Sequence, residues 1–307
     1  MTSILIDRAL SDDERRARIY DGQVVVYPHR PSAQALADLA WEMAVDAFSP
    51  YDPTDAQHRL PVERFVDVLA ALKPAFTHSP RAKELLRALF DDFGCDVDAT
   101  YFDVPKLRVV TSGGYLTSGL GYAYAPHRDT WYSAPPAQIN WWVPIVGVDV
   151  ASCMTFFSTY WNRPVENTSG AFDAYRWNAT GRADARKYVH NDDRNHPRAY
   201  LPEGTPSTEV VGEPGSALLF SAAHLHATVP NTSGSTRFSV DFRSAHFGDL
   251  RAHVGAPTPD SASTGTTLRD FHRARDFEKL PDDLVSGYET GPVAQDGALV
   301  FDPDVVA

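Results

Sequence analysis

His127 and Asp129 are the residues of this chain best suited to hold a metal ion. They stand two positions apart, so in an extended segment their side chains lie on the same side. One imidazole nitrogen and one carboxylate oxygen are two of the three ligands of the facial triad that binds non-haem Fe(II) and leaves three positions open. The pair therefore indicates a candidate site for metal-dependent chemistry.

A second His-x-Asp segment, His190-Asn-Asp192, tests how specific this signal is. With 11 histidines and 40 acidic residues, about one or two chance matches are expected. The second match lies in a polar stretch with no strand beside it, which is typical of a solvated loop. The first match precedes the apolar segment 138–145, which is typical of a strand. The first is therefore the stronger candidate.

The third ligand must come from a distant part of the chain, where His224 and His226 are both available. They share one face in an extended segment, so spacing alone does not choose between them. The turn at 229–234 is followed by a strand that begins near Arg237. We expect a hairpin that places Arg237 beside the histidine, where its guanidinium can bind a carboxylate through two hydrogen bonds. Asp241, on the same face, is the structural alternative as its partner.

The segment from His127 to Asp129, together with the segment from His226 through Val-Pro-Asn-Thr-Ser-Gly to Arg237, resembles the phytanoyl-CoA dioxygenase-like family of Fe(II)/2-oxoglutarate oxygenases. In that family an arginine eleven residues after the distal histidine binds the far carboxylate of 2-oxoglutarate. Arg237 stands at that distance from His226, whereas Ser235 does so from His224. The resemblance therefore implies His226 as the third ligand. It also implies that Thr228 touches the same carboxylate.

The resemblance covers roughly residues 101–245 and extends to the strand after the metal motif. Trp142 matches the tryptophan of the family's strand, and Gln138 and Asn140 share its face by period two, so all three are expected to line the pocket. The chain lacks the family's usual Gly-Ser-His-type segment, and residues 156–207 form a long insertion. Both departures bear on the substrate and not on the iron site.

Three further residues are candidate substrate contacts. Trp131 and Tyr132 follow the metal motif and would stack on substrate or pack in the core, since aromatic side chains favour both. Arg243 would line the pocket or pair with Asp241. The resemblance also implies that the presence of Asp129 favours hydroxylation, desaturation or ring formation, because halogenating members replace this carboxylate with a small residue.

Helices are expected to dominate the first hundred residues. Ser11 to Glu14 is a capping box that opens a short helix. Apolar residues at helical spacing predict a helix over 33–48, a second over 65–72 that stops at Pro74, and a third over 85–93 that ends at Gly94.

Strands are expected from residue 101 onward. The stretch 101–150 is rich in aromatic and β-branched residues, and strands return at 208–212, 216–220 and 237–242. In the last of these, Phe238, Val240 and Phe242 would pack under helices, while the polar residues between them would face a ligand-holding lumen. Residues 156–207 are expected to form a lid or binding loop.

The C-terminal part is predicted as a loop over 255–267, a short helix over 268–280 and an irregular tail. Helices followed by many short strands indicate an α+β fold. We predict a double-stranded β-helix (jelly-roll or cupin-like) core with a helical layer from the N-terminal third. The chain is interpreted as one oxygenase domain, 1–307, divided into helical support 1–100, β core 101–155 and 208–245, insertion 156–207 and C-terminal extension 246–307.

Composition narrows the class of protein. The 307 residues carry a net charge of −12, with no basic stripe, which disfavours nucleic acid and anionic membranes as partners. Cys95 and Cys153 are the two cysteines, too few for a zinc cluster, and buried free thiols are expected. The N-terminus lacks the pattern of a secretory signal and no apolar run approaches 18 residues, so a cytoplasmic protein is expected.

The resemblance implies an enzyme that uses Fe(II), 2-oxoglutarate and O₂, releases succinate and CO₂, and oxidises a small molecule, with secondary metabolism the expected setting. Two alternatives stay open on the residues alone. One is a non-oxidative isomerase or hydrolase in which the metal acts as a Lewis acid and Arg237 binds a substrate carboxylate. The other is a non-catalytic binding protein for a small ligand.

Overall fold

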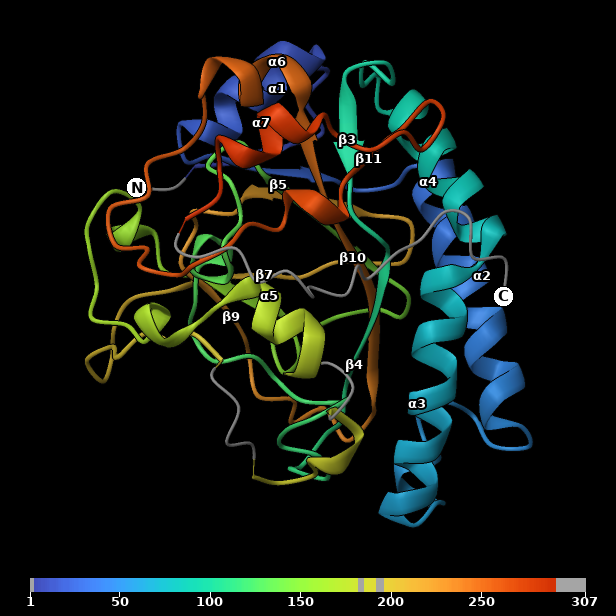
Figure 1. Ribbon diagram of the computed structural model, residues 1–307. Coiled ribbons are helices and arrows are strands. Elements are labelled where there is room, and N and C mark those ends of the chain that lie inside the picture. Colours follow the sequence, from blue (N-terminus) through green and yellow to red (C-terminus); the bar gives the residue numbers. More distant parts are fainter. Residues whose placement is uncertain (1–2, 182–184, 192–195, 291–307) are drawn as a thin grey trace.

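The structure is a computed structural model that describes residues 3–181, 185–191 and 196–290 (Figure 1). Its long helices are α2 (Pro31–Phe48), α3 (Val62–His78) and α4 (Pro80–Asp92), which lie together along one side of the sheet. The shorter α1 (Asp12–Tyr20) begins at the predicted capping box, in which Ser11 accepts from the Glu14 backbone and Glu14 accepts from the Ser11 backbone. The helix predicted over 33–48 is confirmed by α2.

Two sheets build the rest of this mixed α and β fold. The larger has eight strands in the order β1 (Ile4–Ile6), β2 (Val24–Tyr27), β8 (Ala217–Ser221), β5 (Ile139–Pro144), β10 (Arg237–His246), β3 (Thr100–Phe102) and β11 (His272–Arg273), with β4 (Lys106–Val110) also paired to β10. The smaller has the order β7 (Thr208–Val210), β6 (Met154–Phe156) and β9 (His226–Thr228). Strands β1 and β2, from the part predicted as helical support, extend one edge of the larger sheet.

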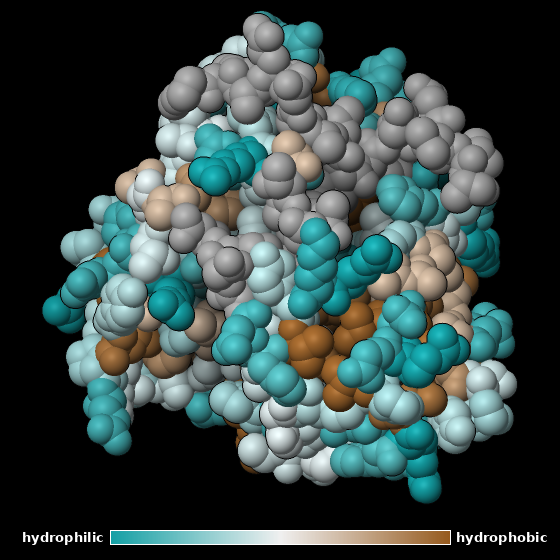
Figure 2. Space-filling view, turned by 60° about the horizontal axis from the view of Figure 1, so that its bottom comes forward, coloured by the Kyte–Doolittle hydropathy of each residue, from teal (hydrophilic) through white to brown (hydrophobic). Residues whose placement is uncertain are grey.

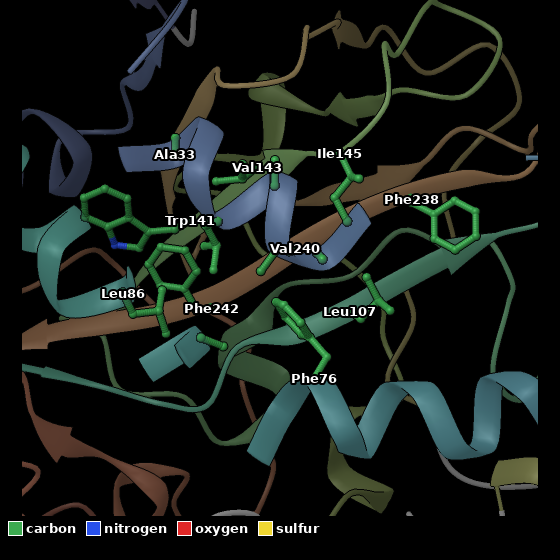
Figure 3. Close-up of a cluster of buried hydrophobic side chains, with 14 of the residues drawn as sticks. Ala33, Phe76, Leu86, Leu107, Trp141, Val143, Ile145, Phe238, Val240 and Phe242 are labelled. Atoms are coloured by element: carbon green, nitrogen blue, oxygen red, sulfur yellow. The ribbon is translucent and has the colours of Figure 1, made fainter. Parts of the chain in front are cut away.

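Strand β10 separates the core from the site. Phe238, Val240 and Phe242 are fully buried on its helix-covered face, as the alternation predicts. Figure 3 shows them packed with side chains of the neighbouring strands and of the helical layer, including Trp141 and Phe76. Each buried side chain of this size contributes about 1.5–3 kcal/mol of transfer free energy. The intervening residues of the strand are thereby turned to the other face of the sheet.

The prediction that the helix over 65–72 stops at Pro74 is wrong. Helix α3 continues through Pro74 to His78. A proline inside a helix costs about 3 kcal/mol because it removes one hydrogen bond and crowds the preceding turn. Continuing the helix buries Phe76 completely against the sheet, which offsets much of that cost. Helix α4 ends at Asp92 with Phe93 as its cap, and Gly94 follows with a left-handed φ of 66°, close to the predicted end.

The helix predicted over 268–280 is also wrong. Leu268–Asp270 forms one 3₁₀ turn, and the chain then enters the short strand β11, which pairs with β3. Phe271 and Leu280 are buried in a cluster with Leu284 of α7 (Asp282–Ser286). Pairing with the open edge of the sheet gives the backbone groups of β11 hydrogen-bond partners in β3, whereas a short isolated helix is only marginally stable.

The expected hairpin between His226 and Arg237 does not form. β9 pairs with β6 in the smaller sheet, whereas β10 pairs with β4 and β5 in the larger one. The turn between them therefore carries the chain from one sheet to the other. His226 and Arg237 nevertheless line the same cavity.

The insertion 156–207 consists, where described, of short turns: 3₁₀ segments at Ser158–Tyr160, Ser169–Ala171 and Ala185–Lys187, helix α5 (Ala174–Arg176) and the π turn Trp177–Gly181. Helix α6 (Phe247–Ala252) follows β10 directly. The predicted extension 246–307 is described to residue 290, and the rest lies outside the described residues.

The outer surface is mixed in polarity. On the face shown in Figure 2, hydrophilic residues cover most of the described surface and hydrophobic ones gather in one area. Among the described residues, no helix has both the length and the apolar composition that crossing a membrane requires.

Candidate metal centre and cofactor pocket

His127, Asp129 and His226 meet at one point of the fold. The backbones of His127 and His226 exchange two hydrogen bonds of 2.9 Å, which brings their rings to a centroid distance of 4.4 Å. Asp129 opens the 3₁₀ turn Asp129–Tyr132, and its Oδ1 lies 3.4 Å from His127 Nε2 and 3.9 Å from His226 Nε2. One ligand atom from each residue lies within 4.8 Å of the others, and all three residues are buried. The three side chains can therefore hold one metal ion together.

The backbone fixes which nitrogen of each imidazole is free. His127 Nδ1 lies 2.8 Å from the carbonyl oxygen of Ala125, and His226 Nδ1 lies 2.9 Å from that of His224. Because a carbonyl oxygen only accepts, each Nδ1 carries the proton and each Nε2 presents a lone pair. Both lone pairs are on the atoms nearest Asp129, the arrangement that outer hydrogen bonds impose on metal-ligating histidines.

The Asp129 carboxylate is held ionised. Burial by itself would raise the pKa of Asp129, but the neighbouring His127 and the charge of Arg243 outweigh this effect, so the pKa falls well below the usual range. Oδ2 lies 3.6 Å from Arg243 Nε and 3.5 Å from Gln138 Nε2, while Oδ1 faces the histidines. One carboxylate oxygen can therefore bind a metal ion, while the other contacts Arg243 and Gln138.

The His226 imidazole is held neutral. Burial, and then the neighbouring His127, lower the pKa of His226 to about 3. A metal ion binds the neutral form of imidazole, so protons compete weakly for this ligand above acidic pH.

His224 lies outside the triad. Its ring packs on Trp161 at a centroid distance of 4.4 Å and its Nε2 lies 3.2 Å from the carbonyl oxygen of Gly22. Its backbone carbonyl is the group that orients His226. The geometry therefore brings His226, and not His224, to His127 and Asp129.

Arg237 is a buried cation with spare hydrogen-bonding capacity. It is 5% exposed, and Nη1 donates to the carbonyl oxygen of Ser152 at 2.8 Å, while Nε has no partner among the described residues. Its guanidinium lies over the Trp142 ring at 5.8 Å, and the indole Nε1 of Trp142 is also without a partner in that part of the chain. Burial lowers the pKa of Arg237 to about 10. A guanidinium buried without a carboxylate is costly, so these donors fit an anionic ligand.

A cavity of about 770 Å³ connects these residues. Thr228, Gln138 and Asn140 line it together with the triad, Arg237, Trp142 and Arg243. Gln138 Nε2 donates to Asn140 Oδ1 at 2.9 Å, so the two amides act as a pair. The donor set of two imidazoles and one carboxylate, with a cavity on its open side, fits Fe(II) and a small chelating acid.

The three candidate substrate contacts lie in different surroundings. Tyr132 lines the cavity with its ring 5.5 Å from that of His127. Trp131 is fully buried outside the cavity lining, and its Nε1 donates to Asp260 Oδ1 at 2.9 Å. Arg243 lines the cavity and also pairs with Asp103, Asp241 and Asp129. Both uses considered for Arg243 therefore occur together.

Several cavity residues were missed by the sequence reading. Arg108 of β4, Tyr122 and Tyr124 of the following loop, Lys73 of α3 and Phe172 of the insertion all line the cavity. The alternation of Lys106 and Arg108 with the apolar Leu107 and Val109 is a signal that could have placed one polar face of β4 in the lumen. Lys73 carries no such signal, because its helix shows only an apolar face directed to the core.

Comparison with known proteins gives matches among solved structures. No protein-family model and no curated protein matches the chain. EvdO2 from Micromonospora carbonacea var. aurantiaca is 16% identical over 77% of this chain and 92% of its own, with a TM-score of 0.41. The epimerase SnoN in complex with Fe³⁺, alpha ketoglutarate and nogalamycin RO is 17% identical over 76% and 83%, with a TM-score of 0.40. The non-heme monooxygenase ThoJ is 13% identical over 71% of each chain, with a TM-score of 0.36. At these identities and TM-scores the matches carry no activity over to this chain.

Proposed function

We propose that this protein is an Fe(II)- and 2-oxoglutarate-dependent oxygenase that oxidises a small molecule of secondary metabolism. The observation that carries the proposal is the pairing, in one cavity, of a His-Asp-His triad with a buried arginine that has no carboxylate partner among the described residues. A metal site alone would fit many reactions. The added cation at the start of β10, Arg237, fits a co-substrate that chelates the metal at one end and carries a second carboxylate at the other.

In this proposal His127, Asp129 and His226 hold Fe(II), while Arg237 and Thr228 hold the far carboxylate of 2-oxoglutarate. Gln138 and Asn140, which bond each other beside Asp129, line the co-substrate pocket. Trp142 covers one face of the Arg237 guanidinium and thereby keeps water from it.

Fe(II) with 2-oxoglutarate and O₂, when bound, supplies an oxidation of the substrate that is coupled to release of succinate and CO₂. The chain's own residues do the rest. Buried Nδ1–H groups keep both imidazoles turned toward the metal, Arg243 keeps Asp129 ionised, and the cavity wall excludes bulk water from the reacting groups. Hydroxylation, desaturation and cyclisation use the same residues and differ in how the substrate lies.

The same proposal covers the finer fold and the setting of the protein. We interpret the two sheets around the cavity as a double-stranded β-helix and residues 1–307 as one oxygenase domain. Trp131 is then a residue that supports the metal turn, while Tyr132 and Arg243 face substrate. Location in the cytoplasm, and the lack of nucleic-acid and membrane partners, stay predictions from composition.

The test is succinate formation from 2-oxoglutarate in the presence of Fe(II), O₂ and a set of small-molecule substrates. We expect activity that disappears on iron removal and in His226→Ala, and that persists in His224→Gln. Loss in His224→Gln together with retention in His226→Ala would contradict the ligand assignment.

The alternatives predict different results in the same assay. Conversion of a substrate in anaerobic buffer without 2-oxoglutarate would favour the Lewis-acid isomerase or hydrolase. Failure to bind iron at all would favour the non-catalytic binding protein.

A further inference from the structure

The cavity is cationic although the protein is acidic. Four carboxylates line it, those of Asp103, Asp129, Asp241 and Asp270. Six cationic side chains line it with them, against a net charge of −12 for the chain: Lys73, Lys106, Arg108, Arg186, Arg237 and Arg243. A local excess of positive charge on an acidic protein is the arrangement expected where an anion binds.

Most of these charges neutralise one another. Arg108 binds Asp241 through two hydrogen bonds of 2.7 and 3.0 Å, and Arg243 binds Asp103 at 3.2 Å. Lys106 also pairs with Asp103. Arg237 binds the far carboxylate of 2-oxoglutarate in the proposed function.

Arg186 is exposed, so Lys73 is left as the partly buried cation with capacity to spare. Its Nζ donates to the carbonyl oxygen of Leu120 at 2.7 Å, and no carboxylate of the described residues lies within 4 Å. An ammonium group has three donors, so two remain for a ligand. Burial, and then the charge of Arg108, lower the pKa of Lys73 to about 7, against the opposing effect of Asp241. An anion bound here would restore the full charge of the ammonium group.

Aromatic side chains form a continuous wall of the same cavity. Tyr122 and Tyr124 have ring centroids 4.7 Å apart, and Tyr132 meets Phe172 at 5.0 Å. The insertion extends this wall, since Phe172 meets Trp177 at 6.0 Å. Such faces and edges favour flat apolar ligands.

Two polar groups of the cavity are already engaged with other side chains of the lining. The Tyr124 hydroxyl accepts from Arg108 at 2.7 Å, and the Gln138 amide donates to Asn140. A hydroxyl group of a ligand buried against the aromatic side chains would lack a hydrogen-bond partner, which costs free energy. An aromatic body with one anionic group matches the wall better.

We infer that the substrate is an aromatic molecule bearing a carboxylate, with Lys73 binding the carboxylate and the wall formed by Tyr122, Tyr124, Tyr132, Phe172 and Trp177 contacting the ring system. This inference rests on the proposed function, because the bound molecule is a substrate only if the protein is an oxygenase. The binding site itself stands on the cavity, its unpaired cation and its aromatic wall.

The test compares three probes by isothermal titration calorimetry on the full chain. 1-Naphthoate has both features, 1-naphthamide keeps the rings without the charge, and glucuronate keeps the carboxylate on a sugar. The protein is loaded anaerobically with Fe(II) and 2-oxoglutarate so that Arg237 is occupied. We expect 1-naphthoate to bind at least about tenfold more tightly than either other probe.

Variants of Lys73 test whether this side chain causes the preference for naphthoate. Lys73→Met should remove the preference for naphthoate over naphthamide, and Lys73→Arg should keep most of it. Lys279→Met, which removes an exposed lysine outside the cavity, is the matched control and should bind like the wild type. Thermal unfolding of each variant checks that it is folded.

Three results would overturn the inference: equal binding of naphthoate and naphthamide, glucuronate binding as tight as naphthoate, or a naphthoate preference that survives in folded Lys73→Met. The titration is repeated on metal-free protein without 2-oxoglutarate. A Lys73-dependent preference there, combined with failure to form an iron complex, would sink the proposed oxygenase activity and leave the aromatic acid site standing.

Discussion

At the scale of single residues, the two oxygens of Asp129 have different neighbours. Oδ1 faces the two imidazoles, and Oδ2 faces Arg243 and Gln138. Arg243 is itself fixed by Asp103 and Asp241. The carboxylate is therefore oriented before any metal arrives, and the freedom lost on binding is small.

This predicts that Arg243→Gln weakens metal binding without touching a metal ligand. We expect the affinity for Fe(II) to fall by about 10–100-fold, the range found for residues that support ligands. Anaerobic calorimetry measures it, with the exposed Arg251→Gln of α6 as the control for loss of one positive charge. An affinity within about twofold of the wild type would show that Arg243 plays no such part.

The triad was predictable in part, for a physical reason. A two-residue spacing in an extended chain places His127 and Asp129 together, and it does the same for His224 and His226. Spacing therefore could not choose the third ligand. The choice depends on which histidine backbone pairs with His127, a contact between segments about a hundred residues apart.

At the scale of elements, Arg128 joins segments that are distant in sequence. It stands between His127 and Asp129, is fully buried, and donates to the carbonyl oxygens of Tyr160, at 2.5 Å, and Ala223. Its guanidinium also lies 3.2 Å from Asp260. The metal turn, the insertion and the C-terminal extension thus share one buried ion pair.

We predict that Arg128→Met destabilises the protein strongly, by about 3–5 kcal/mol in the free energy of unfolding, because it leaves the buried Asp260 carboxylate without its cationic partner. Urea denaturation measures the change, and metal affinity should fall with it. Arg275→Met removes one partner of the exposed pair with Asp98 and should cost far less. Equal effects of the two substitutions would contradict the role of Arg128.

The elements themselves were predictable where local signals decide them. The capping box at Ser11 and the apolar spacing of 33–48 gave the correct helices. The signals failed where tertiary burial decides, as at Pro74, where the burial of Phe76 carries the helix onward. They also failed at 268–280, where an open sheet edge drew the chain into β11.

At the scale of the whole molecule, two buried neutral histidines couple folding to pH. Burial lowers the pKa of His224 to about 4, and burial lowers that of His226 to about 3, whereas an unfolded histidine has a value of about 6.5. Below about pH 6.5 the unfolded chain therefore takes up protons that the folded chain does not. The free energy of unfolding then falls as the pH falls.

For metal-free protein this predicts a loss of about 2 kcal/mol between about pH 6.5 and pH 5.5, from about 1 kcal/mol for each histidine. Urea denaturation in the presence of a chelator measures it. His224→Gln should remove about half of the loss if it folds. Stability that stays constant or rises over this interval would contradict the burial of neutral imidazoles.

The most direct test of the account is an anaerobic titration of metal-free protein with Fe(II) and then 2-oxoglutarate, followed by visible absorption. We predict a charge-transfer band from the chelate, which is lost in Arg237→Ala at the same concentrations and partly restored in Arg237→Lys, because lysine keeps the charge without the two-pronged geometry. Iron binding with no band in the wild-type protein, or an equal band in Arg237→Ala, would contradict the assignment of this cavity to Fe(II) and 2-oxoglutarate.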